Sequence, residues 1–537
     1  MSEDRQGKDL ILAVNSGSSS LKISLYRIAP AFSPTPSSPS SSISSLAPGQ
    51  EPVELLLVST ISNLSAPPAS FSWKPSPTSS TINFGDKIKD SKIQKITSHT
   101  NAFTYFLEHL KNASGLEKGA IGKVCHRVVH GGDYVEPEII DDQTYERIQR
   151  LSDLAPLHNG AALTLIKATL QHLPSATSIA YFDTIFHRTI PPHIYSYAID
   201  PVVARERGLR KYGFHGLSYA YILRTLSTHF TVPVPTTRGL NLIIMHLGSG
   251  ASMVCIKDGK SFDTTMGLTP VSGLPGATRC GNVDPSLVFH WYGSVQAAAE
   301  EKEKEAEAQK EEEKEKEKDG DRKETQGKEA DGDPDGDTDD DGDGKDDMDG
   351  PHGVSRLSHR HTAGVDVRVT IAEEILNRRS GWKAMTGTTN FGEIVAKVKA
   401  SSSSSTTSPD EQGEQVDADV YTLAFNLFLD RLLTYIGSYY LKLGGEIDAL
   451  VFAGGIGEKS PELREAIGKR VQCLGFSIDL DRNANVGNAQ AGEGEDQKVV
   501  DISENWEGKN GRKVFVVWTD EQLEMARQCS LDPRFSQ

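Results

Sequence analysis

A short polar stretch between two apolar runs, VNSGSSSLKIS at residues 14–24, combines an amide, several small hydroxyl residues and a lysine. The flanking runs, DLILAV and LKISLY, are apolar or alternate as strands do, so the N-S-G-S-S-S segment is predicted to form a hairpin tip. Small residues at such a tip let backbone N–H groups and hydroxyls point at one spot, and Lys22 adds a positive charge. A phosphate-binding loop is one interpretation of this composition, but the stretch taken alone favours an ordinary Ser/Gly turn without a ligand, because such residues are common in turns.

A second stretch, NLIIMHLGSGASMVCIKDG at residues 241–259, repeats this layout of strand, polar residue, small residues and strand. His246 takes the place of Asn15, and Gly248 takes the place of Gly17. Two hairpins of one design indicate that the chain consists of duplicated halves.

A third stretch, DALVFAGGIGEKSPELREAI at residues 448–467, predicts a buried strand, a glycine turn and a helix that begins near Ser460 and Pro461. Backbone N–H groups at such a turn suit the phosphates or ribose of a nucleotide. The stretch has Ser460 where a GxGxxG motif needs glycine, and the GKS at 259–261 has Val254 where a P-loop needs glycine. Phosphates must therefore be held in another way.

Four charged or titratable residues lie within an apolar run, directly after one, or in glycine-rich stretches. Arg127 lies within the run VCHRVVHGG, where a guanidinium holds an anion or forms a structural ion pair. Asp183 follows AYF and could bind a metal, orient a substrate or cap a strand end. His215 in KYGFHGLS is either a catalyst or a packed core histidine, and Arg279 in GLPGATRCGNVDP is free to reach into a cleft.

The C-terminal stretch RKVFVVWTDEQLEMAR at residues 512–527 predicts a strand that enters a helix. Thr519 and Gln522 have the spacing of a capping box. Glu521 then lies in the first helical turn, where it either interacts with the helix dipole or coordinates a metal ion.

The net charge of −17 belongs almost entirely to one segment. Residues 300–350 carry 25 acidic and 10 basic side chains, so the rest of the chain has a net charge near −2. We predict an acidic disordered insertion at 294–352, because the segment lacks the apolar residues that would offset the entropy of ordering. An EF-hand-like start at Asp331 has Gly342 where a bidentate Glu is needed, so calcium binding is not expected. Ser-rich residues 30–50 and 400–415 are predicted to be low-complexity loops.

The remaining composition predicts a cytoplasmic protein of two or more domains. A length of 537 residues exceeds the usual size of one domain. The charged first residues and the lack of an apolar run of about 18 residues argue against secretion and a membrane span. Five scattered cysteines without a CxxC motif suit reduced thiols better than disulfides or a zinc site.

Taken together, these stretches resemble the acetate kinase family, which belongs to the wider superfamily of acetate and sugar kinases, Hsp70 and actin. The resemblance spans nearly the whole chain outside the insertions. It is carried in family order by NSGSSSLK, HRVVHGG, LAPLHNG (154–160), FDTIFH, YGFHGLS, HLGSGAS, TTMGLTPVSGLPGATRCGNVDP (264–285), FAGGIGEKS and WTDEQ.

The resemblance implies an α/β, duplicated two-domain, ribonuclease-H-like fold of the actin/Hsp70 type with a central cleft. We expect a first domain at 1–183 plus 519–537 and a second at 184–518. The implied reaction is ATP + acetate to ADP + acetyl phosphate, reversible and dependent on Mg2+, with Mn2+ as the alternative ion. A homodimer is implied, and neither nucleic acid nor a membrane is expected as a partner.

The resemblance also implies roles for individual residues. Arg127 and Arg279 would hold the carboxylate and the transferred phosphoryl group, Asp183 would position acetate, and His215 would stabilise the transition state. Asn15 and Glu521 match positions that organise the metal ion and phosphate. The implied acetate-side residues are Val129, Leu157, His158, Phe214 and Pro270. The implied ATP-side residues are Ser18, Ser20, Lys22, His246, Gly248, Ser249, Gly250, Asn390, Gly455, Ile456, Gly457 and Arg464.

These roles suit phosphoryl transfer, which asks a protein mainly for in-line positioning and for cations around the equatorial oxygens. An acetate oxygen is already a deprotonated nucleophile, so no general base is needed. Three positions depart from the common family pattern: Ser249 replaces an Asn, Lys459 replaces an Asn, and TTNFGE at 388–393 replaces a DFR-containing stretch.

The alternatives are a propionate or butyrate kinase of the same framework, a pyrophosphate-linked variant, and a non-catalytic ATP-binding scaffold of the superfamily. The joint presence of Arg127, Arg279 and His215 argues against the scaffold, since a clamp gated by ATP would not need all three.

Overall fold

The chain divides into two compact units. One consists of Met1–Asn282, His359–Val369 and Glu374–Gln537, and the other of Val283–Ser358 and Thr370–Glu373. In the second unit, Thr370 and Glu373 form a capping box in which each side chain accepts a hydrogen bond from the backbone N–H of the other. The computed structural model describes residues 9–17, 19–29, 50–64, 66–77, 82–152, 156–230, 239–291, 358–362, 365–403, 412–489, 498–504 and 512–535.

The first large sheet has the strand order β5-β4-β3-β2-β1-β6-β8-β7. β1, β2 and β3 pair antiparallel in sequence, β6 joins β1 in parallel, and β8 joins β6 in parallel. Its strands are β1 (Leu10–Ser16), β2 (Ser20–Ile28), β3 (Val53–Ser62), β4 (Ala69–Pro75), β5 (Ile88–Ile93), β6 (Ile121–Val128), β7 (Glu138–Ile139) and β8 (Thr177–Phe182).

The second large sheet has the order β11-β10-β9-β14-β16-β15. β9, β10 and β11 pair antiparallel, β14 joins β9 in parallel, and β16 joins β14 in parallel. Its strands are β9 (Leu242–Leu247), β10 (Ala251–Lys257), β11 (Lys260–Thr264), β14 (Ala449–Ala453), β15 (Val499–Asp501) and β16 (Lys513–Val517), and a separate pair is formed by β12 (Ser358–Thr362) and β13 (Val365–Val369).

The two large sheets share one plan of three antiparallel strands followed by two parallel ones. The series β3-β2-β1-β6-β8 in the first sheet corresponds to β11-β10-β9-β14-β16 in the second. Each series ends on an antiparallel edge strand, β7 or β15. This repeat confirms the predicted duplicated α/β fold, and both predicted hairpins, β1–β2 and β9–β10, are present.

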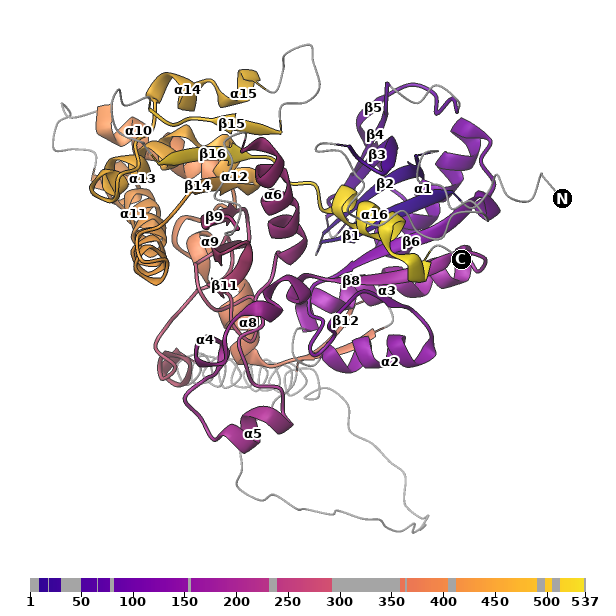
Figure 1. Cartoon of the computed structure of the whole chain (residues 1–537), viewed down its shortest axis with the longest axis horizontal. Helices are drawn as coiled ribbons and strands as arrows, with labels where there is room; N and C mark the ends of the chain where they lie inside the picture. The colour runs from indigo at the N-terminus through magenta and orange to yellow at the C-terminus, as the bar shows by residue number, and fades with distance from the viewer. Residues whose placement is uncertain are drawn as a thin grey trace, which may run out of the picture. The chain divides into compact units, whose positions relative to one another are not determined.

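Helices cover both faces of each sheet (Figure 1). α1 and α3 pack on one face of the first sheet, and α9, α10, α11 and α13 pack on the outer face of the second. α6 and α16 share one hydrophobic core with the inner faces of both sheets. The helices are α1 (His99–Ser114), α2 (Asp142–Leu151), α3 (Pro156–His172), α4 (Pro192–Tyr195), α5 (Pro201–Glu206), α6 (Gly216–His229), α8 (Ile371–Arg378), α9 (Gly381–Thr386), α10 (Phe391–Ser403), α11 (Gln412–Lys442), α12 (Gly454–Lys459), α13 (Pro461–Val471), α14 (Leu480–Ala484), α15 (Val486–Ala489) and α16 (Glu521–Leu531).

Two local predictions at helix starts are corrected. The glycine turn predicted after β14 is a short helix, α12, although the predicted cap of the next helix is confirmed, because the Ser460 side chain accepts from the Leu463 N–H. The capping box of Thr519 and Gln522 is wrong. Asp520 is the cap of α16, and its carboxylate accepts from the Leu523 N–H at 2.8 Å. A carboxylate one position later satisfies the same free helix-end donors.

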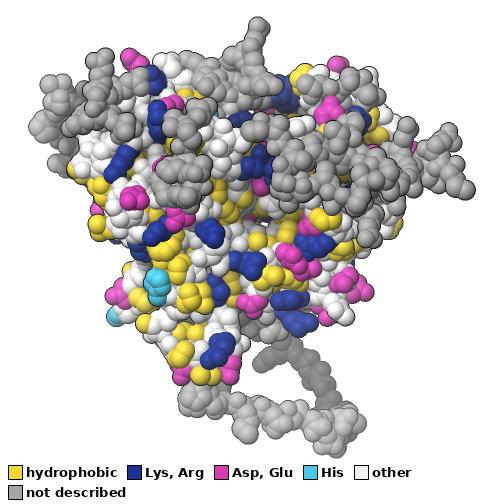
Figure 2. Space-filling model, in the orientation of Figure 1, with side chains coloured by type: hydrophobic (Ala, Val, Ile, Leu, Met, Phe, Trp, Pro, Cys, Tyr) yellow, Lys and Arg dark blue, Asp and Glu magenta, His cyan; other side chains and the backbone are white. Residues whose placement is uncertain are grey.

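The predicted insertion at 294–352 lies outside the described residues, as do residues 30–49 of the first predicted loop. In the second, α10 continues through Ser403 and α11 begins at Gln412, which leaves only 404–411 between the helices. The chain as far as it is described contains no helix long and apolar enough to cross a membrane. On the face drawn in Figure 2, acidic and basic side chains are interspersed.

The first turn of α6 packs against the end of β8 so closely that only glycine fits. A Cβ atom at Gly216 would lie 1.8 Å from the carbonyl oxygen of Asp183. We therefore expect Gly216→Ala to destabilise the protein by about 1 to 3 kcal/mol, through displacement of α6 or of Asp183. Differential scanning fluorimetry should show this as a lower unfolding midpoint.

Gly437→Ala is the matched control, because nothing lies within 4 Å of the added Cβ and alanine favours the α11 helix. Its midpoint should stay the same or rise. Equal losses in the two variants would contradict the packing described at Gly216.

Candidate active site

The period of the strands explains why three distant polar residues meet at one edge of the first sheet. β1, β6 and β8 are adjacent and parallel, so their carboxyl ends lie together. Successive side chains of a strand alternate between the faces, and Asn15, Arg127 and Asp183 continue the rows that face α16. The buried members of those rows are Ile11, Ala13, Cys125, Ile179 and Tyr181.

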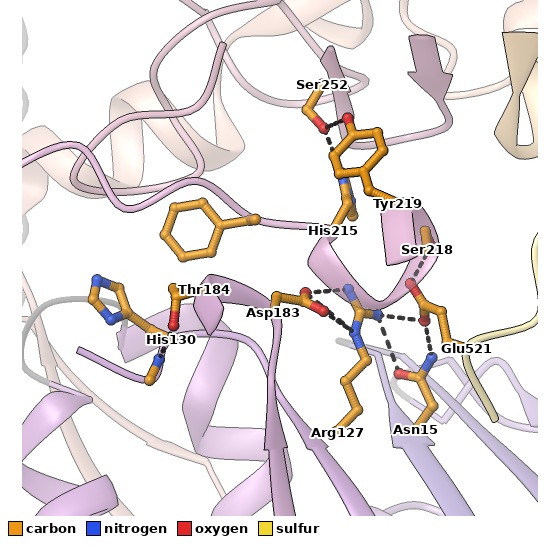
Figure 3. A network of polar contacts seen from close by, with 12 residues as sticks. Asn15, Arg127, His130, Asp183, Thr184, His215, Ser218, Tyr219, Ser252 and Glu521 are labelled. Atoms are coloured by element: carbon orange, nitrogen blue, oxygen red, sulfur yellow. Dashed lines mark hydrogen bonds and ion pairs between the residues drawn. The ribbon is translucent and has the colours of Figure 1, made fainter. Parts of the chain in front are cut away.

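Arg127 is the centre of the resulting network (Figure 3). Its Nη2 donates to Asp183 Oδ2 at 2.6 Å, and its Nε lies 3.2 Å from the same oxygen. Its Nη1 lies 3.0 Å from Glu521 Oε2 and donates to Asn15 Oδ1 at 3.3 Å. Asn15 Nδ2 in turn donates to Glu521 Oε2 at 2.6 Å, and the Ser218 hydroxyl donates to Glu521 Oε1 at 2.6 Å. Of the two interpretations of Arg127 from the sequence, the structure shows the ion pair, and binding of an anion stays a prediction.

The two carboxylates around Arg127 differ in their electrostatics. Burial raises the pKa of Asp183 above its ordinary value, and Arg127 opposes this shift. Burial would also raise the pKa of Glu521, but Arg127, the Ser218 hydroxyl, His246 and Lys22 outweigh it and lower the pKa. Glu521 is thus the carboxylate whose charged form the site favours.

The second sheet also contributes side chains to the site, through the same alternation of side chains along its strands. His246 in β9 and Ser252 in β10 are directly paired and lie on the rows that face α6. His215 precedes α6 with a left-handed backbone (φ 59°) and stacks on His246 with ring centroids 4.4 Å apart. Its Nδ1 lies 2.8 Å from Ser252 Oγ.

Arg279 reaches this part of the site from the glycine-rich loop. Its guanidinium lies against the second hairpin tip, since a Cβ added to Gly250 would be 3.0 Å from Nη1. The loop is attached to that tip by the Ala277 N–H, which donates to the Ser249 carbonyl at 2.8 Å. Burial lowers the pKa of Arg279 to about 10, so the side chain stays charged at neutral pH.

The charges of both arginines affect the pKa of His215. Burial lowers its pKa well below the ordinary value, and the charges of His246, Arg127 and Arg279 lower it further. The structure therefore brings together seven residues that were singled out from the sequence: Asn15, Arg127, Asp183, His215, His246, Arg279 and Glu521.

The hairpin tips place their small residues beside this network. Lys22 is paired with Asn15 across β1 and β2, and its charge contributes to the lowered pKa of Glu521. Ser20 is half-buried, Ser249 is exposed, and Ser18 lies outside the described residues. His99 Nε2, at the start of α1, lies 2.8 Å from the Gly17 carbonyl and anchors the first tip. No local pattern in the sequence pointed to His99.

The nucleotide-side predictions divide into two groups. Gly455 and Ile456 in α12 reach the surface, as a binding loop requires. Arg464 is only 1% exposed, and its guanidinium donates to the Gly457 carbonyl at 2.7 Å and to Asn483. These hydrogen bonds hold α12 in place. They explain the burial of Arg464 without a direct contact to a ligand. Asn390 similarly accepts from the Gly392 N–H at the start of α10.

The acetate-side predictions meet an apolar cluster beside His215. Val129 and Phe214 pack there with three residues that sequence reasoning missed, Tyr212, Met266 and Leu268. Pro270 is buried four residues after Met266. Leu157 and His158 lie in the first turn of α3, but their side chains are outside the described part of the chain.

His130 packs against the apolar cluster. Its ring packs edge-to-face against Phe214 with centroids 5.3 Å apart, and its Nε2 lies 3.1 Å from the Leu268 carbonyl. Its backbone is fixed by Asn159, which exchanges two hydrogen bonds of 3.0 Å with it. The residue stands in the quoted motif HRVVHGG, so its position in that motif was the available signal.

The oxygen donors suit a hydrated divalent ion better than an all-protein cage. Among the described residues, no three His, Cys, Asp or Glu side chains form a metal cluster. Mg2+ typically keeps several waters and uses one or two carboxylates together with substrate phosphates. Asn15 and the ionised Glu521, 2.6 Å apart at Nδ2 and Oε2, provide such a set next to the first hairpin tip.

Comparison with known proteins gives consistent matches over most of the chain. The sequence profile of the Acetokinase family matches residues 72–309 and 361–527. A "probable acetate kinase" of Neurospora crassa is 39% identical over an alignment covering 98% of this chain and 95% of the relative. A propionate kinase structure from Francisella tularensis has a TM-score of 0.64 at 25% identity and covers 97% of this chain and 98% of that chain. An acetate kinase structure from Porphyromonas gingivalis has a TM-score of 0.61 at 24% identity, covering 97% and 98%.

Two sheets of one plan, each contributing a hairpin tip to a shared polar site, define a kinase of the duplicated ribonuclease-H-like fold. The match to the family profile and the similarity to the fungal relative identify the family within this class of kinases. The chain belongs to the Acetokinase family.

Buried histidines give the fold a defined pH dependence. Burial lowers the pKa of His126 to about 3 and that of His130, His187 and His246 to about 4. Between these values and the ordinary pKa of about 6.5, the unfolded chain binds protons that the folded chain does not. These groups therefore stabilise the fold fully above about pH 6.5, and their contribution falls as the pH is lowered toward 4.

We expect His126→Asn to show a smaller loss of thermal unfolding midpoint than the wild type between pH 7.5 and pH 5.5. The variant lacks one of the groups that the unfolded chain protonates in this range. The measurement is a series of thermal melts at fixed ionic strength. An unchanged pH slope in the variant would show that His126 is not held neutral by burial.

Proposed function

We propose that the chain is an acetate kinase, which transfers a phosphoryl group reversibly between ATP and acetate to give ADP and acetyl phosphate. The observation that carries this proposal is the meeting of Arg127, Arg279 and His215 beside two duplicated hairpin tips. The names of the fungal and bacterial relatives support acetate as the acceptor. A propionate or butyrate kinase is less favoured, and a scaffold would not need this set of cations.

Arg127 and Arg279 would neutralise charge on the acetate carboxylate and on the transferred phosphoryl group. A guanidinium has five N–H groups. The contacts of Arg127 to Asp183, Asn15 and Glu521 leave one Nη2 hydrogen unused among the described residues, which can point to an anion. Asp183 holds this guanidinium through two of its nitrogens, so we assign it a positioning role and not that of a base.

The acetate methyl would pack against the apolar cluster of Val129, Phe214, Met266 and Leu268. The cluster lies beside His215, because its member Phe214 directly precedes His215 in the chain. An apolar wall excludes water from the anhydride that forms, and it discriminates one methylene by only about 1 to 3 kcal/mol.

The family generally uses a divalent metal ion with ATP, and we propose Mg2+, with Mn2+ as the alternative. Asn15 and Glu521 would hold the hydrated ion at the first hairpin tip, where it neutralises phosphate charge when bound. The remaining ATP contacts would come from Ser18, Ser20, Lys22 and the tip at His246–Gly250. We also propose a homodimer in the cytoplasm, with domains divided near residues 183 and 518; these rest on the family resemblance.

A hydroxamate assay for acetyl phosphate tests the proposed reaction. With ATP, Mg2+ and acetate the wild type should form product, and Arg279→Ala should reduce kcat by about 100- to 1000-fold through loss of charge at the phosphoryl group. Parallel reactions with propionate and butyrate should give lower kcat/KM values. Wild-type product no higher than that of Arg279→Ala would favour the scaffold, and a preference for butyrate would correct the acceptor.

Glu521→Gln tests the proposed metal site. Loss of the carboxylate charge should raise the Mg2+ concentration for half-maximal activity at least about tenfold. Glu524→Gln is the matched control on the same helix, because Glu524 instead pairs with Arg224 at 3.1 Å. Initial rates over a Mg2+ titration provide the measurement, and equal shifts in the two variants would remove Glu521 from the metal site.

A further inference from the structure

Two hydroxyl groups behind His215 form a chain that ends on its ring. Tyr219 lies one helical turn after His215 in α6, and its hydroxyl is hydrogen-bonded to Ser252 Oγ. Ser252 Oγ lies 2.8 Å from His215 Nδ1. Ser252 and Tyr219 are fully buried, and Figure 3 draws His215 between them and the Arg127 network.

The directions of these hydrogen bonds follow from counting donors and acceptors. Burial raises the pKa of Tyr219, so its hydroxyl keeps its hydrogen. Among the described residues, Ser252 Oγ is the only group to which that hydrogen is bonded. Tyr219 therefore donates to Ser252, and the Ser252 hydrogen is directed to the remaining neighbour, His215 Nδ1.

The opposite order would leave a buried hydrogen unsatisfied. If His215 carried its hydrogen on Nδ1, it would donate to Ser252, and Ser252 would donate to the Tyr219 oxygen. The Tyr219 hydrogen would then have no acceptor in the described structure, which is costly for a buried polar group. His215 Nδ1 is thus an acceptor, and the ring hydrogen resides on Nε2.

The location of this hydrogen matters for phosphoryl transfer. A neutral imidazole can present either a donor or a lone pair at Nε2. A lone pair would repel the phosphoryl oxygens, whereas an N–H would donate to them. His215 Nε2 makes no hydrogen bond to any described residue, so it is available to a ligand in the site.

We propose that Ser252 and Tyr219 are positioning residues that hold neutral His215 with its hydrogen on Nε2, so that it donates to the transferred phosphoryl group. This inference deepens the proposed function and rests on it for the identity of the acceptor. It also gives a role to the cross-strand pairing of His246 with Ser252. His246 stacks on the face of the His215 ring, and Ser252 contacts Nδ1 at the edge of the same ring.

The first test is a kinetic comparison with ATP and acetate. Ser252→Ala should lower kcat about 10- to 100-fold and change either KM less than threefold, because the ring stays in place but loses its fixed tautomer. Ser252→Thr keeps the hydroxyl and should restore kcat to within about threefold of the wild type. Unchanged kcat in Ser252→Ala would overturn the proposal.

Ser261→Ala is the matched control. Ser261 Oγ lies 2.9 Å from His187 Nδ1, which makes a second buried serine–histidine pair, but His187 Nε2 is already bonded to the Phe214 carbonyl. Its loss should lower the unfolding midpoint about as much as Ser252→Ala and reduce kcat far less. Equal kcat losses in the two variants would reduce Ser252 to a stabilising residue and overturn the proposal.

The second test needs no turnover. Nitrogen-15 NMR of histidine-labelled wild type, with the His215 signals identified by their absence in His215→Gln, reports which ring nitrogen carries hydrogen. We expect the Nε2–H form in the wild type; an Nδ1–H form or an imidazolium would overturn the proposal even if the variants misfold. A wild type that forms no acetyl phosphate but shows the Nε2–H form would instead refute the proposed function alone.

Discussion

The buried contact between Arg127 and its two carboxylates determines how the rest of the site is arranged. A charge taken out of water must be compensated by close partners, and the two partners of Arg127 come from distant parts of the sequence. Asp183 directly follows β8 of the first sheet, whereas Glu521 begins α16, which follows β16 of the second sheet. The ion pair between Arg127 and Glu521 therefore joins the end of β6 in the first sheet to the start of α16.

The two sheets contribute different kinds of side chain to the site. The first sheet provides Arg127 and, directly after β8, Asp183, whereas the second provides His246 and, at the start of α6, His215. Glu521 comes from α16. The helices α6 and α16 share one hydrophobic core with both sheets. One duplicated strand plan thereby gives two chemically different halves of the site, because the next-to-last residue of β1 is Asn15 and that of β9 is His246.

The sequence predicted the parts of the site that depend on local periodicity. Apolar runs and turn chemistry predicted both hairpins, the strand that contains Arg127, the strand that ends before Asp183, and the helix that begins at Ser460. The contact of Asn15 with Glu521 joins residues 506 positions apart, so no local pattern could predict it and only the family resemblance linked the two. The cap of α16 was misplaced because Thr519 and Asp520 are adjacent capping residues, and only tertiary packing selects between them. Ser252 and Tyr219 were missed because their role depends on the orientation of the His215 ring.

The central claim is that two arginines and one imidazole surround the phosphoryl group as it passes between ADP and acetate. A crystal structure with ADP, Mg2+, acetate and aluminium fluoride, whose planar fluoride mimics the transferred group, tests this claim most directly. Fluorine atoms within hydrogen-bonding distance of Arg127, Arg279 and His215 Nε2, in line with an acetate oxygen, are the predicted result. A fluoride bound away from these three side chains, or acetate bound on another surface, would contradict it.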